Sequence, residues 1–356
     1  MDRIFKREIK IGNKFIGSNN PIAIQSMTNT NTKDIDSTVN QINELEKNGC
    51  DIVRIAVTDF FEAECVSKIK SRINIPLVAD IQFNYKLALE CVKNGIDKIR
   101  INPGNIGNED KIREVVESCK YYNVPIRIGV NGGSLQKDLL SIYGKKTTNA
   151  LVESAMQNIN LLEKFNFNDI VISVKSSDVS MMIESYTKIS NLVDYPLHLG
   201  VTEAGLFLSG AVKSSIGIGS LLFNGIGDTI RVSLTDDPVN EVKVAKEILK
   251  SLNLYNKGVN LISCPTCSRT KFNLFKLASE VEDLTKNIDK NLTIAVMGCA
   301  VNGPGEAREA DIGVAGGVGE GIIFKKGEIL KKVKEENLLE ELKKEFGQAT
   351  FFTATD

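Results

Sequence analysis

The sequence contains no long uncharged apolar segment and no excess of charge of either sign. No run approaches the ~18 apolar residues that a membrane-spanning helix requires, so a membrane protein is not expected. The 44 Lys and Arg residues nearly balance the 45 Asp and Glu residues, which gives no general electrostatic reason to expect nucleic acid or an anionic membrane as a partner. Any anion must therefore be bound by a local cluster of cations.

Histidine is also scarce, and the cysteines lack the spacing of a secreted protein. His198 is the only histidine among 356 residues, and the seven cysteines are an odd number without a disulfide framework. Residues 1–7 lack the apolar core of a signal peptide. We therefore expect reduced thiols and a cytoplasmic location. The cysteines expected to be small buried core residues are Cys50, Cys65, Cys91 and Cys119.

Short apolar runs alternate with amphipathic segments through most of the chain. At 356 residues the chain exceeds the size at which one core usually stops growing. Eight strand–helix units over roughly 250 residues fit a closed TIM-type (β/α)8 barrel better than an open doubly wound sheet. The predicted strands are Pro21–Met27, Ile52–Val57, Pro76–Ile81, Lys98–Ile101, Pro125–Val130, Asp169–Val174, Pro196–Val201 and Thr229–Leu234.

The barrel pattern ends after a predicted helix at Pro238–Leu252. Residues 255–258 are typical of a turn, so we predict a barrel domain at residues 1–254 and a smaller C-terminal α/β domain at residues 258–356. The elements predicted for the smaller domain are strands at Val259–Ser263, Leu292–Met297, Ile312–Val314 and Ile322–Phe324, and helices at Thr270–Lys286 and Glu335–Phe346.

Four arginines, each between Ile or Val residues, lie within the predicted barrel strands. They are Arg54, Arg100, Arg127 and Arg231. Parallel barrel strands are buried on both faces, where a guanidinium is costly unless a ligand or an acidic partner satisfies it. Since the planar guanidinium matches phosphate oxygens two at a time, these arginines, with Lys175 nearby, predict an electropositive bowl that binds a multiply charged phosphate ester.

Acidic and amide residues follow the predicted strands at the C-terminal face, where barrel active sites lie. Asp80, Asn102 and Asn131 precede or flank turns, several of them rich in glycine, which lets backbone amides approach an anion. Glu203 follows the seventh strand, and His198 lies within it. A lone strand histidine is more often a core residue, so Glu203 is the favoured proton-transfer group.

The last third of the chain carries a set of possible metal ligands. Cys264 and Cys267 are separated by two residues, and Cys299 and Glu306 follow a later predicted strand. Four interpretations compete: a structural zinc site, a thioredoxin-like dithiol, a closed cluster that borrows a barrel cysteine, and a [4Fe–4S] cluster with three thiolates. In the last, the fourth iron takes Glu306, water or substrate. Ligand softness and count favour it.

Several long motifs, in a fixed order, carry a resemblance to a known family. The segments Arg100–Gly107, Arg127–Asn131, Gly200–Gly205 and Gly225–Leu234, with both cysteine motifs, closely resemble the 4-hydroxy-3-methylbut-2-enyl diphosphate synthase family. The resemblance covers essentially the whole chain. It implies a barrel that binds 2-C-methyl-D-erythritol 2,4-cyclodiphosphate and a C-terminal iron–sulfur domain.

The resemblance also implies a reaction and its partners. The cyclic diphosphate is opened by two electrons, with loss of a hydroxyl as water, to (E)-4-hydroxy-3-methylbut-2-enyl diphosphate of the non-mevalonate isoprenoid pathway. Flavodoxin or ferredoxin supplies the electrons, and members are homodimers in which one subunit's cluster domain caps the other's barrel.

Residue roles carry over by motif. The implied cluster ligands are Cys264, Cys267, Cys299 and Glu306, and the implied catalytic residues are Glu203 and Glu306. Taken with the strand positions, the candidate substrate-binding residues are Arg54, Asp80, Gln82, Arg100, Asn102, Arg127, Asn131, Lys175, His198, Arg231 and Ser233. The family motif usually has histidine at position 82. Since glutamine donates hydrogen bonds but carries no transferable proton, only a positioning role is expected of Gln82.

Two other classes of protein remain as alternatives. One is a non-redox phosphate-ester-binding barrel, a lyase or sensor, with a structural metal site. The other is an iron–sulfur scaffold that transfers its cluster. Glu306→Ala separates the first from a reductase, because only the reductase loses turnover.

Overall fold

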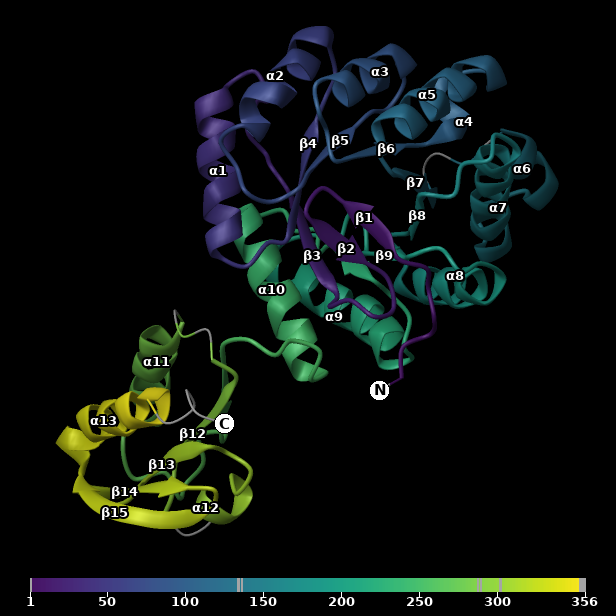
Figure 1. Cartoon of the computed structure of the whole chain (residues 1–356). Helices are drawn as coiled ribbons and strands as arrows, with labels where there is room; N and C mark the ends of the chain where they lie inside the picture. The colour runs from purple at the N-terminus through teal and green to yellow at the C-terminus, as the bar shows by residue number, and fades with distance from the viewer. Residues whose placement is uncertain are drawn as a thin grey trace. The chain divides into compact units, whose positions relative to one another are not determined.

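A computed structural model describes residues 2–132, 135, 137–286, 288, 290–300 and 303–351. The chain forms two compact units, Met1–Tyr255 and Asn256–Asp356 (Figure 1). None of the helices in the described residues combines the length and the apolarity needed to cross a membrane.

The first unit contains a parallel eight-stranded sheet in the order β8-β7-β6-β5-β4-β3-β10-β9. A bridge between Ile172 and Leu197 joins β8 to the segment before β9, which brings the two ends of the sheet together. The strands are β3 Ala23–Met27, β4 Ile52–Ala56, β5 Leu77–Asp80, β6 Lys98–Ile101, β7 Ile126–Asn131, β8 Ile170–Lys175, β9 His198–Leu199 and β10 Thr229–Ile230. The predicted (β/α)8 barrel is confirmed.

Helices surround this sheet, as Figure 1 shows. Most begin after an Asp, Asn or Thr whose side chain accepts a hydrogen bond from the first helical turn, which satisfies an otherwise unpaired backbone amide. The helices are α1 Ile35–Lys47, α2 Phe60–Lys70, α3 Tyr85–Lys93, α4 Pro103–Ile106, α5 Glu109–Tyr122, α6 Lys137–Tyr143, α7 Thr148–Lys164, α8 Val179–Leu192, α9 Phe207–Phe223 and α10 Pro238–Ser251. The four cysteines of this unit are buried, as expected.

An N-terminal hairpin lies at the apolar floor of the barrel. Strands β1 (Ile9–Ile11) and β2 (Lys14–Ile16) pair antiparallel, and their isoleucines form one buried cluster with Ala23, Ile52, Val78 and Val171. All four of these residues are the first or second residue of a barrel strand. The hairpin was not predicted, because each strand has only three residues.

The second unit is a five-stranded sheet in the order β11-β12-β13-β14-β15, with the first three strands parallel. Its elements are β11 Val259–Ser263, α11 Leu274–Thr285, β12 Leu292–Met297, α12 Gly303–Glu306, β13 Ile312–Gly316, β14 Glu320–Lys325, β15 Glu328–Lys334, the 3-10 turn η2 Glu335–Asn337 and α13 Leu338–Phe351.

The structure differs from the sequence prediction for this unit in two details. The helix predicted from Thr270 begins at Leu274, because the Asn273 side chain caps it. The edge strand β15 was not predicted, since four of its seven residues are charged.

Candidate active site

Polar side chains fill the barrel interior above the apolar floor. Arg100 and Arg127 are direct register partners on β6 and β7, and Asp80 on β5 pairs with Arg100. Arg54 pairs with Val78, two residues before Asp80. The expectation that the four arginines occupy equivalent strand positions was therefore wrong. Arg231 lies just beyond the end of β10.

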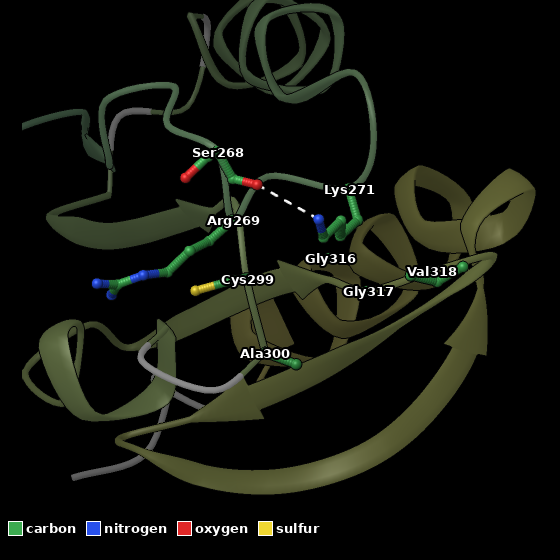
Figure 2. A pocket seen from close by; sticks show the side chains of 8 residues that line it. All are labelled: Ser268, Arg269, Lys271, Cys299, Ala300, Gly316, Gly317 and Val318. Atoms are coloured by element: carbon green, nitrogen blue, oxygen red, sulfur yellow. Dashed lines mark hydrogen bonds between the residues drawn. The ribbon is translucent and has the colours of Figure 1, made fainter.

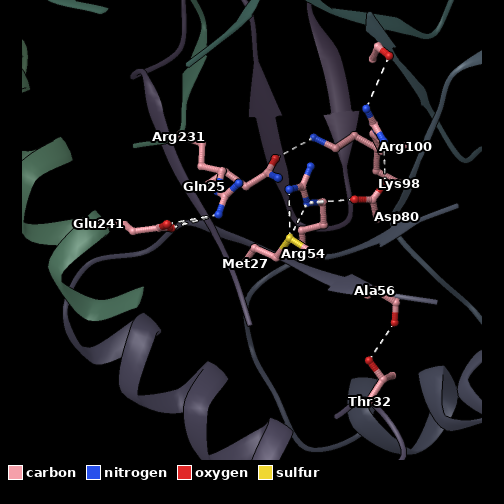
Figure 3. A network of polar contacts seen from close by, with 11 residues as sticks. Gln25, Met27, Thr32, Arg54, Ala56, Asp80, Lys98, Arg100, Arg231 and Glu241 are labelled. Carbon is pink, nitrogen blue, oxygen red and sulfur yellow. Dashed lines mark hydrogen bonds and ion pairs between the residues drawn. The ribbon is translucent and has the colours of Figure 1, made fainter. Parts of the chain in front are cut away.

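Asp80 is the carboxylate that holds two of these arginines. Its oxygens lie 2.9 Å from Arg100 Nη1 and 3.7 Å from Arg54 Nε (Figure 3). Asp80 is 8% exposed. Burial by itself raises the pKa of this carboxyl, but the guanidinium groups of Arg54, Arg100 and Arg127 outweigh burial and lower it. Asp80 is therefore ionised at neutral pH.

Arg127 is the most deeply buried of the arginines, at 1% exposed. Its Nε and Nη1 atoms have no hydrogen-bond partner among the described residues. Burial and the neighbouring Arg54 and Arg100 lower its pKa, yet a guanidinium keeps its proton near neutral pH. A buried cation with unpaired donors favours an anionic ligand.

Arg54 and Arg100 have further contacts. Arg54 Nε and Nη2 lie 3.2 and 2.9 Å from Met27 Sδ, a weak acceptor, and burial lowers the pKa of Arg54 to about 10. Arg100 lies against Gly129, where a Cβ atom would collide with its guanidinium. Glycine at this position thus allows Arg100 to lie across β7.

Glu241 on α10 fixes Arg231. Its Oε1 accepts hydrogen bonds from Arg231 Nη2 and from the Leu234 backbone amide, both at 3.1 Å, and its Oε2 accepts one from Ser26 Oγ at 3.0 Å. Glu241 is 4% exposed. Sequence reasoning missed it, since an acidic residue in a first helical turn is ordinary.

His198 is fully buried and belongs to the core as much as to the site. Its Nδ1 lies 2.8 Å from Thr229 Oγ1, and Nε2 has no partner among the described residues. Burial, then the cations Arg127 and Lys175, hold the pKa of His198 well below its usual value, so the imidazole is neutral. The Tyr186 hydroxyl donates to the His198 carbonyl and accepts from the Val174 amide.

The other predicted residues divide into a buried and an exposed group. Lys175 is buried, Asn102 is buried and caps α4, and Asn131 and Ser233 are half-buried. In the amide orientation that satisfies both its atoms, Asn131 accepts a hydrogen bond from Arg100 Nη2 at 3.2 Å.

Gln82 and Glu203 are exposed, in contrast to the residues of the buried group. Glu203 has a backbone φ of +53°, a left-handed conformation that is uncommon for residues other than glycine and is found disproportionately at functional sites.

The three cysteines of the second unit lie beyond strand ends. Cys264 follows β11, and Cys299 follows β12 and Gly298. The Gly298 amide donates to Cys264 Sγ at 3.0 Å. Backbone amides at Arg269 and Thr270 lower the pKa of the exposed Cys267. Amide donors directed at sulfur stabilise thiolates.

A pocket of about 530 Å³ lies beside Cys299 (Figure 2). Its lining includes Arg269 and Lys271, and the Lys271 ammonium donates to the Ser268 carbonyl at 3.3 Å. Glu306 is exposed in α12. Val301 and Asn302 of the second cysteine motif lie outside the described residues.

The donor chemistry of this unit fits a soft metal centre, although the candidate ligands that the structure describes do not lie together in one cluster. Within the described residues, no three His, Cys, Asp or Glu side chains lie close enough together to hold a metal ion. Three thiols with amide donors near two of them nevertheless match the preference of iron–sulfur clusters for thiolates.

Fold and site define a class: a TIM-type barrel with a buried cationic interior, joined to an α/β unit that presents three cysteines. Family models described as "GcpE TIM-barrel domain" and "GcpE protein C-terminal domain" match residues 6–246 and 260–348. The chain belongs to the GcpE family.

Three similar curated proteins share one name. The protein called "4-hydroxy-3-methylbut-2-en-1-yl diphosphate synthase (flavodoxin)" from Fusobacterium nucleatum is 62% identical over 95% of this chain and 96% of its own length. Proteins of the same name from Caldanaerobacter subterraneus and Clostridium perfringens are 62% and 60% identical over 96% of this chain, and over 97% and 98% of their own lengths.

Among solved structures, 7,8-dihydropteroate synthase from Vibrio fischeri superposes with a TM-score of 0.51. The match covers 69% of this chain and 98% of that one, at 15% identity. At that identity the likeness shows the fold alone.

Proposed function

We propose that this chain opens 2-C-methyl-D-erythritol 2,4-cyclodiphosphate reductively to (E)-4-hydroxy-3-methylbut-2-enyl diphosphate, the reaction of the synthases among its relatives. The observation that carries the proposal is the buried guanidinium of Arg127, whose unpaired nitrogens lie in an interior rich in cations. A non-redox phosphate-binding barrel is not favoured, because relatives about 60% identical bear the name of the synthase.

The arginines bind the diphosphate and stabilise it as it leaves. Ring opening breaks a carbon–oxygen bond, and negative charge grows on the departing phosphate oxygen. Arg54, Arg100 and Arg127 are buried or nearly so, where preorganised donors act most strongly. Asp80 and Glu241 hold the guanidinium groups in place before the ligand arrives.

A proton must reach the hydroxyl that leaves as water. Two electrons and two protons convert the cyclic diphosphate into the product and one water. We assign the donation to Glu203, whose place after β9 lies at the C-terminal end of the barrel. The neutral His198 imidazole would orient the ligand through hydrogen bonds.

The electrons require a redox centre, and Cys264, Cys267, Cys299 and Glu306 would hold a [4Fe–4S] cluster. Amide donors near Cys264 and Cys267 support this. Such a cluster supplies single electrons at low potential. The relatives' names support flavodoxin as the donor, with ferredoxin as the other candidate. The homodimer implied by the resemblance remains a prediction that sedimentation tests.

The test is anaerobic turnover by protein reconstituted with iron and sulfide. Wild type should consume the cyclic diphosphate with a low-potential reductant and release the linear diphosphate. Arg127→Met should weaken binding roughly 30-fold or more, because a buried charged contact is lost. Arg72→Met, on the exposed Arg72–Asp36 pair, is the matched control.

Glu306→Ala distinguishes the reductase from a non-redox barrel. We expect the variant to bind the cyclic diphosphate and to lose turnover. A fully loaded wild type that does not bind the cyclic diphosphate would overturn the proposal.

A further inference from the structure

Lys98 is a buried lysine with no part in the site described so far. It lies on β6 two residues before Arg100, so both side chains point to the same side of the strand. Lys98 is fully buried, at 0% exposed. Its Nζ contacts Gln25 Oε1 at 3.4 Å (Figure 3), a long contact for an ammonium group.

No carboxylate of the described residues lies within ion-pair distance of Lys98, whose only recorded polar partner is Gln25. Arg54 and Arg127 repel a positive charge there. Asp80, the nearby acid, is already paired with Arg54 and Arg100. The charged and titratable groups that the surrounding strands contribute are Arg54 on β4, Asp80 on β5, Arg100 on β6, Arg127 on β7, Lys175 on β8, His198 on β9 and Arg231 after β10.

The group that can relieve this repulsion is an amine. A guanidinium keeps its proton near neutral pH, whereas a buried lysine readily becomes neutral. Burial, then Arg127 and Arg54, lowers the pKa of Lys98 well below its usual value. The carbonyl oxygen of the Gln25 side chain can accept a hydrogen bond from either the neutral or the protonated form of the amine. The amide nitrogen of Gln25 has no partner among the described residues.

We propose that Lys98 is a positioning residue of the anion site, an uncharged amine in the empty barrel that becomes an ammonium when the cyclic diphosphate binds. The amine takes one proton from solvent, and no other bond changes. A dianion close to the arginines cancels part of their repulsion, which favours the protonated form. The inference rests on the proposed function for the identity of the anion.

Two consequences follow for binding. Binding and proton uptake are linked, so affinity falls as pH rises above the pKa of Lys98 in the empty protein, by up to about tenfold per pH unit. The ligand does not imitate this trend, because each phosphorus of a cyclic diphosphate carries one strongly acidic oxygen and stays ionised throughout.

Calorimetry in buffers of different ionisation enthalpy measures the proton uptake. The reconstituted full chain, without reductant, is titrated with the cyclic diphosphate at pH 8. We expect wild type to take up close to one proton, Lys98→Met to take up much less and bind more weakly, and Lys93→Met, an exposed lysine on α3, to match wild type. Equal uptake by wild type and Lys98→Met overturns the proposal.

A second measurement does not depend on the cyclic diphosphate. In protein labelled with carbon-13 at the lysine Cε atoms, the Lys98 resonance is identified by its absence from Lys98→Met. Its shift at pH 8 should be that of an amine, and an ammonium shift overturns the proposal. If wild type gives no binding heat, the proposed function fails together with the ligand-linked step, while the resonance still decides the charge of the empty site.

Discussion

Asp80→Asn removes the carboxylate that two buried arginines share. Asparagine keeps the shape and one acceptor oxygen, but it leaves Arg54 and Arg100 without a neutralising charge in a site where Asp80 is 8% exposed. Removing one member of a buried ion pair costs about 3–5 kcal/mol. Since the amide still accepts a hydrogen bond, we expect a loss near the lower end, about 3 kcal/mol.

The loss should be visible by thermal unfolding. For a unit of this size, about 3 kcal/mol lowers Tm by roughly 6–12 °C. The pKa of Asp80 is lowered in the folded protein, so its contribution is fully present above the unfolded value of about 3.9 and is lost as pH falls below that. The difference between wild type and variant should therefore narrow in acid.

The ligand provides the decisive comparison. Saturating cyclic diphosphate should raise the Tm of Asp80→Asn more than that of wild type, because the anion supplies the missing negative charge. Asp36→Asn, at the exposed Arg72 pair, should leave Tm unchanged. A fall of less than 2 °C for Asp80→Asn, or equal stabilisation of both proteins by ligand, would refute the role of Asp80.

Three other changes have clear expected outcomes. Glu241→Gln should weaken cyclic diphosphate binding roughly tenfold by calorimetry, since Arg231 loses its charged partner; an unchanged Kd contradicts this. Gly298→Ala should lower the uptake of iron and sulfide, because a Cβ atom there would lie 2.7 Å from Thr270 Oγ1 and 3.3 Å from Cys264 Sγ. Gly305→Ala, with open space around it, should take up iron and sulfide normally. Equal uptake by the two variants would contradict a role of Gly298 in leaving room beside the Cys264 thiol. Because the pKa of Lys98 is lowered in the folded protein, the free energy of unfolding of wild type rises with pH up to roughly 10.4. Lys98→Met lacks this pH dependence, so the free energy of unfolding of wild type relative to the variant should rise between pH 7 and 10, by at most about 1.4 kcal/mol per pH unit. A difference that stays constant with pH in urea unfolding rules this out.

The barrel could be predicted because its signal is repeated. Each apolar run is long enough to bury a strand, and the arginines stand out as charges within such runs. The partners of those arginines could not be predicted in the same way. Glu241 belongs to a helix distant in sequence from most of the site, and Lys98 at a strand start is indistinguishable from an exposed lysine until the register with Val78 is known.

Exposure was harder to predict than position. Gln82 and Glu203 follow strands, as the motifs require, yet both residues are exposed. In the second unit, the start of α11 depends on Asn273 acting as a cap. A sequence usually offers several residues that could cap a helix or end a strand, and the packing of the folded chain determines which of them does so.

The synthase assignment is tested most directly by counting electrons against product. Reconstituted, reduced protein is mixed anaerobically with a known amount of 2-C-methyl-D-erythritol 2,4-cyclodiphosphate, and the linear diphosphate is quantified by mass spectrometry. We predict two electrons consumed for each (E)-4-hydroxy-3-methylbut-2-enyl diphosphate formed. Conversion without electron consumption, or no conversion by protein with a full complement of iron and sulfide, would contradict it.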